Sequence, residues 1–151
     1  MEKIRENSMK GINVDSLISH VFKLWMRSKK QILDEFRLTG SQYEVISAIY
    51  HLSSLHKEII QVDLSEETGI DPMTISTVLR NLEKNNIITR IRGTINTRVI
   101  YIKLTKEGKT LYNMASSKML SCCNNLYRNI DEKNFTAQLL LLSNELNKLN
   151  N

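Results

Sequence analysis

The chain has 151 residues, of which 41% are hydrophobic, and its 21 Lys and Arg residues against 16 acidic ones give a net charge of +5. A chain of this length can bury the core of one small protein, and no run of about 18 apolar residues predicts a membrane span. The charged N-terminal residues are not followed by the apolar core of a secretion signal, so we expect a soluble, cytoplasmic protein.

Two helices are predicted in the first part of the chain. Apolar residues recur at helical spacing over Val14–Phe36, with Asn13 or Asp15 available as the N-cap. A second helix follows Gly40 and continues to about Leu55 on a similar apolar pattern. Two helices are therefore expected before the central segment, after a short N-terminal arm.

The central segment predicts a helix-turn-helix. Residues 61–68 are expected to form a short helix with Val62 and Leu64 turned inward, and Gly69 supplies the turn. A second helix follows the N-cap residue Asp71. In this arrangement the first helix braces the second, which can lie in a DNA groove.

The second helix has Pro72 at its first position and two chemically different faces. Its buried face is predicted from apolar residues at helical spacing: Ile75, Val78, Leu79 and Leu82. The candidate DNA-contacting residues are hydroxyl, amide and cationic: Thr74, Ser76, Thr77, Arg80, Asn81 and Lys84. Such groups suit phosphates and base edges in a major groove, although a solvated helix face beside a structural hairpin has the same pattern.

Two β-branched runs follow, Ile87–Ile91 and Val99–Ile102, and they predict a two-stranded hairpin. Gly93 and Asn96 between them supply turn chemistry. Arginines near the tip of such a hairpin, or wing, can lie along the DNA backbone or enter a narrow minor groove. The candidate DNA contacts of the wing are Arg90, Arg92, Thr94, Asn96 and Arg98.

Positive charge is concentrated in this helix and hairpin. Residues 71–110 contain eight Lys and Arg residues against three acids, so this segment alone has the net charge of the whole chain. That distribution is expected of a nucleic-acid-binding surface. A winged helix that binds only proteins has no general need for it, and stays the alternative. The chain lacks phosphate-loop, nucleophile-elbow and zinc-protease motifs, so we expect no enzyme activity.

Two more helices are expected after the hairpin, one from Thr105 to about Ile130 and a last one that begins at Asp131. The last helix has an apolar stripe, with Leu139–Leu142 at its centre, that is too broad for a surface helix. We infer a homodimer in which two recognition helices face the half-sites of a pseudo-palindrome.

The predicted fold is mainly α with a small β-hairpin wing: a winged helix-turn-helix with long terminal dimerisation helices. Residues 1–38 are assigned to an N-terminal arm and dimerisation helix, 39–104 to the DNA-binding domain, and 105–151 to the C-terminal dimerisation helices. These parts are expected to form one compact chain and not independent domains.

Over nearly its whole length the chain resembles the MarR family of bacterial transcription regulators. The segment NTRVIYIKLTKEG, residues 96–108, is similar to the family signature of Asp-x-Arg, five residues, and Leu-Thr-x-x-Gly, with Asn96 in place of the Asp. The resemblance implies that Arg98 enters the minor groove, while Thr77 stands where an Arg is common. The implied function is that of a sequence-specific DNA-binding regulator, a repressor released by a ligand, with an activator as the alternative.

The resemblance also implies a crevice between the dimerisation helices and the DNA-binding domain, where a small anionic or phenolic ligand binds. The candidate crevice residues are His20, Trp25, Tyr43 and Tyr50. An aromatic stripe on a helix is more often part of a plain hydrophobic core than a ligand site. The ligand assignment is therefore open at this point.

The adjacent Cys122 and Cys123 suggest a thiol-based redox sensor as a further alternative, or simply buried cysteines. A disulfide between neighbours in a helix would distort it, which leaves an intersubunit bridge or a lone thiolate. Peroxide-sensing members of the family carry their cysteine near the start of the first helix, where this sequence has none. His20, His51 and His56 are not spaced for a tetrahedral metal site, so neither metal nor other cofactor is expected.

Overall fold

The structure, a computed structural model, describes residues 13–55 and 58–150. The first part of the expected N-terminal arm and His56 lie outside the described residues. The chain forms two compact units, residues 1–115 and 116–151, and one long helix passes from the first into the second.

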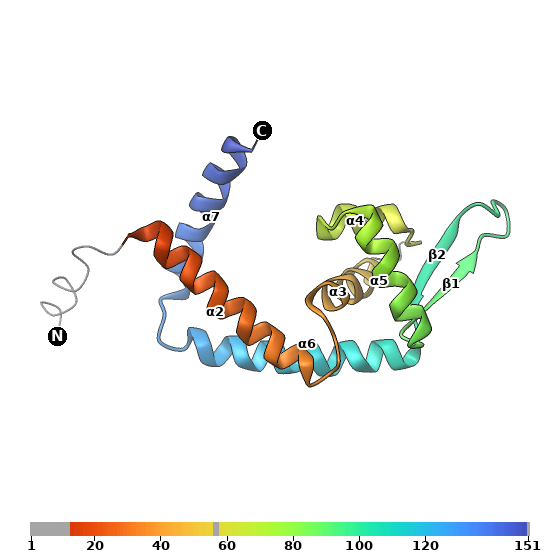
Figure 1. Cartoon of the computed structure of the whole chain (residues 1–151), viewed down its shortest axis with the longest axis horizontal. Helices are drawn as coiled ribbons and strands as arrows, with labels where there is room; N and C mark the ends of the chain where they lie inside the picture. Colours follow the sequence, from red (N-terminus) through yellow and green to blue (C-terminus); the bar gives the residue numbers. More distant parts are fainter. Residues whose placement is uncertain (1–12, 56–57, 151) are drawn as a thin grey trace, which may run out of the picture. The chain divides into compact units, whose positions relative to one another are not determined.

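The described residues form six helices and one two-stranded sheet, which confirms the predicted mainly α fold with a hairpin (Figure 1). In chain order they are α2 (Val14–Asp34), α3 (Gly40–Ser54), α4 (Gln61–Thr68), α5 (Pro72–Lys84), β1 (Ile88–Arg92), β2 (Ile100–Leu104), α6 (Lys106–Tyr127) and α7 (Glu132–Leu149). None of the helices in the described part of the chain is long and apolar enough to span a membrane.

Local capping explains where the helices begin. Asn13, and not Asp15, caps α2, because its side-chain oxygen accepts from the Ser16 N–H at 3.1 Å. Thr39 and Gln42 form a capping box at α3, with bonds of 3.2 and 2.9 Å between each side chain and the other residue's N–H. These local bonds fix the first turns of α2 and α3 without the help of tertiary contacts.

The end of α2 differs from the prediction. The helix stops at Asp34, two residues before Phe36, and Arg37 has a φ of 55°. A left-handed residue cannot continue a right-handed helix, so the chain turns here toward α3. Only Ile32 and Leu33 of α2 are buried, whereas most of its predicted apolar stripe is exposed: Val14, Leu17, Ile18, Val21 and Leu24.

The core of the first unit lies between α3, α4, α5 and the hairpin. Its most completely buried side chains are apolar: Val45, Ile46, Ile49, Leu64, Ile75, Leu79, Leu82, Ile88 and Ile102. The prediction that Val62 faces inward with Leu64 was wrong, because Val62 is 59% exposed. Two residues apart on a helix are separated by about 200° around its axis, so one core can bury only one of them.

The hairpin is antiparallel, with Ile88 opposite Leu104 and Arg92 opposite Ile100. Each strand begins one residue later than predicted. At the closed end of the hairpin, the Gly93 N–H donates to the Val99 carbonyl at 2.9 Å. A Cβ at Gly93 would lie 2.6 Å from the Asn96 carbonyl oxygen, so the turn needs glycine here.

The second unit contains the end of α6 and all of α7. Asp131 caps α7 by accepting from the Asn134 N–H at 3.2 Å, as the sequence predicts. Within this unit the rings of Tyr127 and Phe135 lie 6.3 Å apart. None of the residues of α7 is buried, and its exposed apolar side chains include Phe135, Leu139, Leu140, Leu141, Leu142, Leu146 and Leu149.

Candidate nucleic-acid interface

Helix α5 has the two faces that the sequence predicts. Its four core-facing residues, Ile75, Val78, Leu79 and Leu82, are all buried. The candidate contact residues Thr74, Thr77, Arg80, Asn81 and Lys84 are exposed, and Ser76 is half-buried. The phase of the helix is therefore confirmed, and it leaves polar and cationic residues outside the core from Thr74 to Lys84, after the exposed Met73.

Helix α4 braces the start of α5. Gly69 ends α4 in the left-handed conformation, with a φ of 69°, and its N–H donates to the Ser65 carbonyl at 2.9 Å. The Gln61 side-chain amide donates to the Pro72 carbonyl at 3.0 Å, across the turn. Figure 1 shows α4 beside α5 and the hairpin at the far end of α5. This is the predicted helix-turn-helix.

Asp71 fixes the first turn of α5. Its carboxylate accepts from the N–H groups of Met73 and Thr74 at 3.1 and 2.9 Å. The hydrogen bond with the Thr74 side chain, and then that with the Thr74 backbone, hold the pKa of Asp71 below its ordinary value. The N-terminal turn of α5, where a recognition helix meets the base edges, is thereby held in place.

A side-chain bond orders the middle of the exposed face. The Thr77 hydroxyl donates to the Met73 carbonyl at 3.2 Å and accepts from Nη2 of Arg80 at 3.2 Å. The short threonine therefore positions the long guanidinium one turn further along the helix.

The wing carries its polar candidates on exposed positions. Arg92, Thr94, Asn96 and Arg98 are all exposed. The Asn96 side-chain oxygen accepts from the Arg98 backbone N–H at 3.1 Å, which is the Asx-turn geometry. Asn96 therefore shapes the backbone that carries Arg98, a role that asparagine performs without a charge.

Arg90, the remaining wing candidate, is engaged with a residue of α5 that sequence reasoning missed. Its Nε donates to Oε2 of Glu83 at 2.8 Å, and its Nη2 donates to the same oxygen. The bond to Arg90 lowers the pKa of Glu83, and the same bond raises the pKa of Arg90. Glu83 and Arg90 lie seven residues apart in sequence and in different elements. The spacing rules for side-chain pairs on one helix therefore do not predict their contact.

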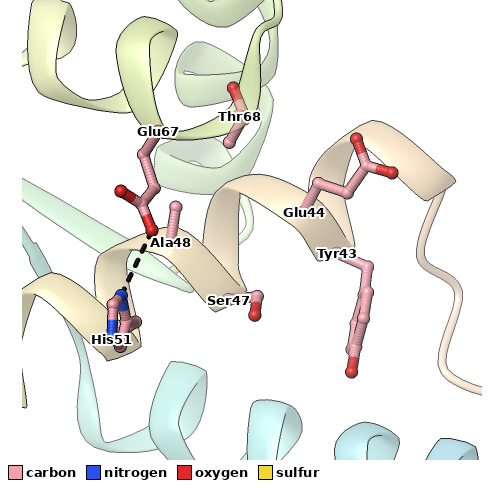
Figure 2. Close-up of a pocket in the computed structure, with 7 residues that line it drawn as sticks. All are labelled: Tyr43, Glu44, Ser47, Ala48, His51, Glu67 and Thr68. Carbon is pink, nitrogen blue, oxygen red and sulfur yellow. Dashed lines mark hydrogen bonds and ion pairs between the residues drawn. The ribbon is translucent and has the colours of Figure 1, made fainter. Parts of the chain in front are cut away.

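The candidate ligand residues do not gather in one hollow. A hollow of about 340 Å³ lies between α3 and α4. Figure 2 shows the residues that line it: Tyr43, Glu44, Ser47, Ala48, His51, Glu67 and Thr68. His51 and Glu67 pair across it at 3.2 Å. His20 lines a separate hollow on α2, Trp25 is half-buried, and the exposed Tyr50 has its ring 4.4 Å from that of Tyr112.

The two cysteines are partly exposed and form no disulfide. The interpretation of Cys122 and Cys123 as buried cysteines was therefore wrong, since the end of α6 leaves both open to solvent in part. Among the residues that the structure describes, no three His, Cys, Asp or Glu side chains come together as a metal site would require.

Comparison with known proteins gives both a family and a fold. The family model described as transcriptional regulator SarA/Rot matches residues 27–115, more than half of the chain. The homoprotocatechuate degradative operon repressor of Escherichia coli is 29% identical over 109 residues, which are 72% of this chain and 68% of the relative.

Two solved structures share the fold. The complex of S. aureus MepR with DNA aligns with a TM-score of 0.77 at 22% identity, covering 91% of this chain and 96% of that one. Bordetella bronchiseptica BpsR, whose DNA binding is regulated by 6-hydroxynicotinic acid, aligns with a TM-score of 0.73 at 18% identity, covering 88% and 92%. The predicted resemblance is confirmed: the chain is a MarR-type winged-helix protein and belongs to the SarA/Rot family of transcriptional regulators.

Proposed function

We propose that this protein is a sequence-specific DNA-binding regulator, a repressor, that places α5 in a major groove and the wing against the adjacent backbone or minor groove. The observation that carries the proposal is the outer face of α5, where the buried residues point the other way and the exposed residues from Thr74 to Lys84 are polar or cationic. MepR, which has this fold, forms a complex with DNA, and the repressor of Escherichia coli supports the direction of regulation.

The residues assigned to DNA divide by their role. Thr74, Thr77 and Asn81 on α5 suit base edges, whereas Arg80 and Lys84 suit phosphates. Ser76, half-buried, belongs to the edge of this face. On the wing we assign contacts to Arg92, Thr94, Asn96 and Arg98, and consider Arg90 below. A regulator with this surface needs no catalytic residue. We expect it in the cytoplasm, where bacterial DNA lies.

We infer a homodimer from the terminal helices. The apolar side chains of α7 and of the first turns of α2 are exposed in a single chain, and water-exposed leucines at this density favour association. Residues 1–38 and 105–151 would then hold the two copies together, while 39–104 bind one half-site each. A two-fold dimer makes the operator a pseudo-palindrome.

A small-molecule ligand is the proposed signal. The relation of BpsR to 6-hydroxynicotinic acid supports this for the fold. The hollow in Figure 2 is the candidate place, since Tyr43 lines it together with the paired His51 and Glu67. A ligand there would lie against both α3 and α4, and would thereby alter the brace of the recognition helix.

The test is selection of genomic fragments by the purified protein, followed by titration of the enriched fragment at two salt concentrations. We expect a pseudo-palindrome of roughly 16–20 base pairs, bound by a dimer. If the dimer neutralises about six to ten phosphates, affinity falls about 10³- to 10⁵-fold between 50 and 200 mM salt. No enriched sequence, with only weak binding at low salt, would refute the proposal and favour a winged helix that binds proteins.

A further inference from the structure

Glu83 and Arg90 join the last turn of α5 to the middle of β1. The Nε and Nη2 groups of Arg90 both donate to Oε2 of Glu83. The side chain of Glu83 is 38% exposed and that of Arg90 is 30% exposed. Arg92 and Arg98 lie nearer the tip and are exposed. Among the wing arginines, Arg90 is therefore the one held against the body of the domain.

We propose that Arg90 is a positioning residue, which sets the angle of the wing against the recognition helix through Glu83 and does not contact phosphate. This inference rests on the proposed function, because the angle matters only if both elements bind one DNA site. It assigns to Glu83 a role in DNA affinity although its charge has the wrong sign for DNA.

The connection between α5 and β1 explains why such a link is needed. Asn86 has a φ of 58°, and the Ile87 N–H donates back to the Leu82 carbonyl at 2.9 Å, so the chain turns sharply before the strand. On the other strand, the Ile102 N–H donates to the Ile59 carbonyl at 2.8 Å and holds β2. The Glu83 and Arg90 pair supplies the corresponding side-chain link for β1.

A two-stranded hairpin is only marginally stable by itself. The orientation of the wing is therefore set by its contacts with the rest of the domain. If Arg90 left Glu83 for a phosphate, it would leave a carboxylate unpaired close to the DNA backbone. The pair avoids that repulsion and fixes the hairpin at the same time. Its contribution to DNA affinity is therefore geometric.

The sign of the effect of Glu83→Gln separates the two roles. Removing an acid from a DNA-binding face should strengthen binding if only charge matters. If Glu83 holds the wing, the same change weakens operator binding, by about two- to fivefold, as expected for the loss of one exposed ion pair. Arg90→Gln should give a similar loss, and the double variant should lose no more than either single one.

The salt dependence of binding gives a second, independent readout. Arg90→Gln should leave the slope of log affinity against log salt unchanged. Arg98→Gln, the matched control on the same wing, should make that slope shallower by about one for each phosphate that the variant no longer neutralises. Arg90→Lys keeps the charge but not the two-donor geometry, so it should behave as Arg90→Gln. Circular dichroism melts check that each variant folds.

Two results would overturn the inference while the proposed function stands: tighter binding by Glu83→Gln, or a slope for Arg90→Gln that falls as it does for Arg98→Gln. Should Arg90→Gln fail to fold, Glu83→Gln and Arg90→Lys decide the question: tighter operator binding by Glu83→Gln, or wild-type operator affinity for Arg90→Lys, would overturn the inference. A wild-type protein without salt-dependent operator binding would overturn both the inference and the proposed function.

Discussion

Arg98 is the wing residue on which operator affinity should depend most directly. Its backbone is held by Asn96, and its side chain is exposed, so Arg98→Ala removes a charge without a packing cost. We expect operator binding to weaken by at least about 1 kcal/mol, with the dimer intact. Fluorescence anisotropy measures the affinity, and sedimentation measures the dimer.

Lys30→Ala is the control for this variant, because Lys30 is an exposed cation on α2 that pairs with Asp34 and not with the wing. It removes the same charge from the chain. Equal affinities for the Arg98 variant and the wild type would show that the wing does not reach the DNA through this residue.

Asp71 makes the start of the recognition helix sensitive to acid. Its pKa is held below the ordinary value of 3.8, first by the hydrogen bond with the Thr74 side chain, so its charged form stabilises the folded state. This stability is fully present above the unfolded-state pKa and is lost as pH falls through the lower, folded-state pKa. We therefore expect the thermal midpoint to fall on acidification through that range.

Asp71→Asn is the matched variant, because asparagine is an equally good N-cap but does not titrate. Its thermal midpoint should lack the component that Asp71 contributes, so the difference between wild type and variant should shrink between pH 7 and pH 3. Melts across this range measure it. Parallel pH profiles for the two proteins would contradict the role given to the Asp71 carboxylate.

Among the elements, α5 offers a direct test of its own two faces. Leu79 is 1% exposed, so Leu79→Ala should cost about 2–5 kcal/mol in the free energy of unfolding. Thr77 is on the opposite side, and Thr77→Ala should change stability by less than about 0.5 kcal/mol while it weakens or alters DNA binding. Urea denaturation compares the two. Unfolding of the Thr77 variant would mean that this face is not free for DNA.

The sequence was sufficient for elements whose ends are set locally. Asp71 and Pro72 fix the start of α5, and Asp131 fixes that of α7, because caps act within one turn. It was insufficient where tertiary packing decides. The side of α4 that faces the core is chosen by α3 and α5, which is why Val62 was misplaced.

The candidate site shows the same division. Exposed positions on α5 follow from helical periodicity, which is a property of the helix alone. The Glu83 and Arg90 pair, and the contact of Tyr50 with Tyr112, join residues whose approach depends on how the chain folds back. No spacing in one sequence identifies such pairs, so the positioning chemistry became visible only in three dimensions.

At the scale of the whole molecule, the exposed leucines of α7 call for a second surface that covers them. Leu140 and Leu141 are each 60% exposed on α7. A two-fold interface on this face would bury these residues in both copies. Burial of one leucine side chain is worth about 1.5–3 kcal/mol, so a charge at Leu140 costs that gain in both copies and adds an unpaired charge. We therefore predict that Leu140→Glu converts the dimer into a monomer.

The monomer should keep its winged helix, because none of the α7 residues belongs to the core of the first unit. It would then bind one half-site, with weaker operator affinity and about half the salt slope, since half of the phosphate contacts remain. Asn147→Glu adds the same charge to α7 without removing a leucine and is the control. Analytical ultracentrifugation measures the association. A Leu140→Glu protein that stays dimeric and binds the full operator would place the dimer contacts elsewhere than on this helix face.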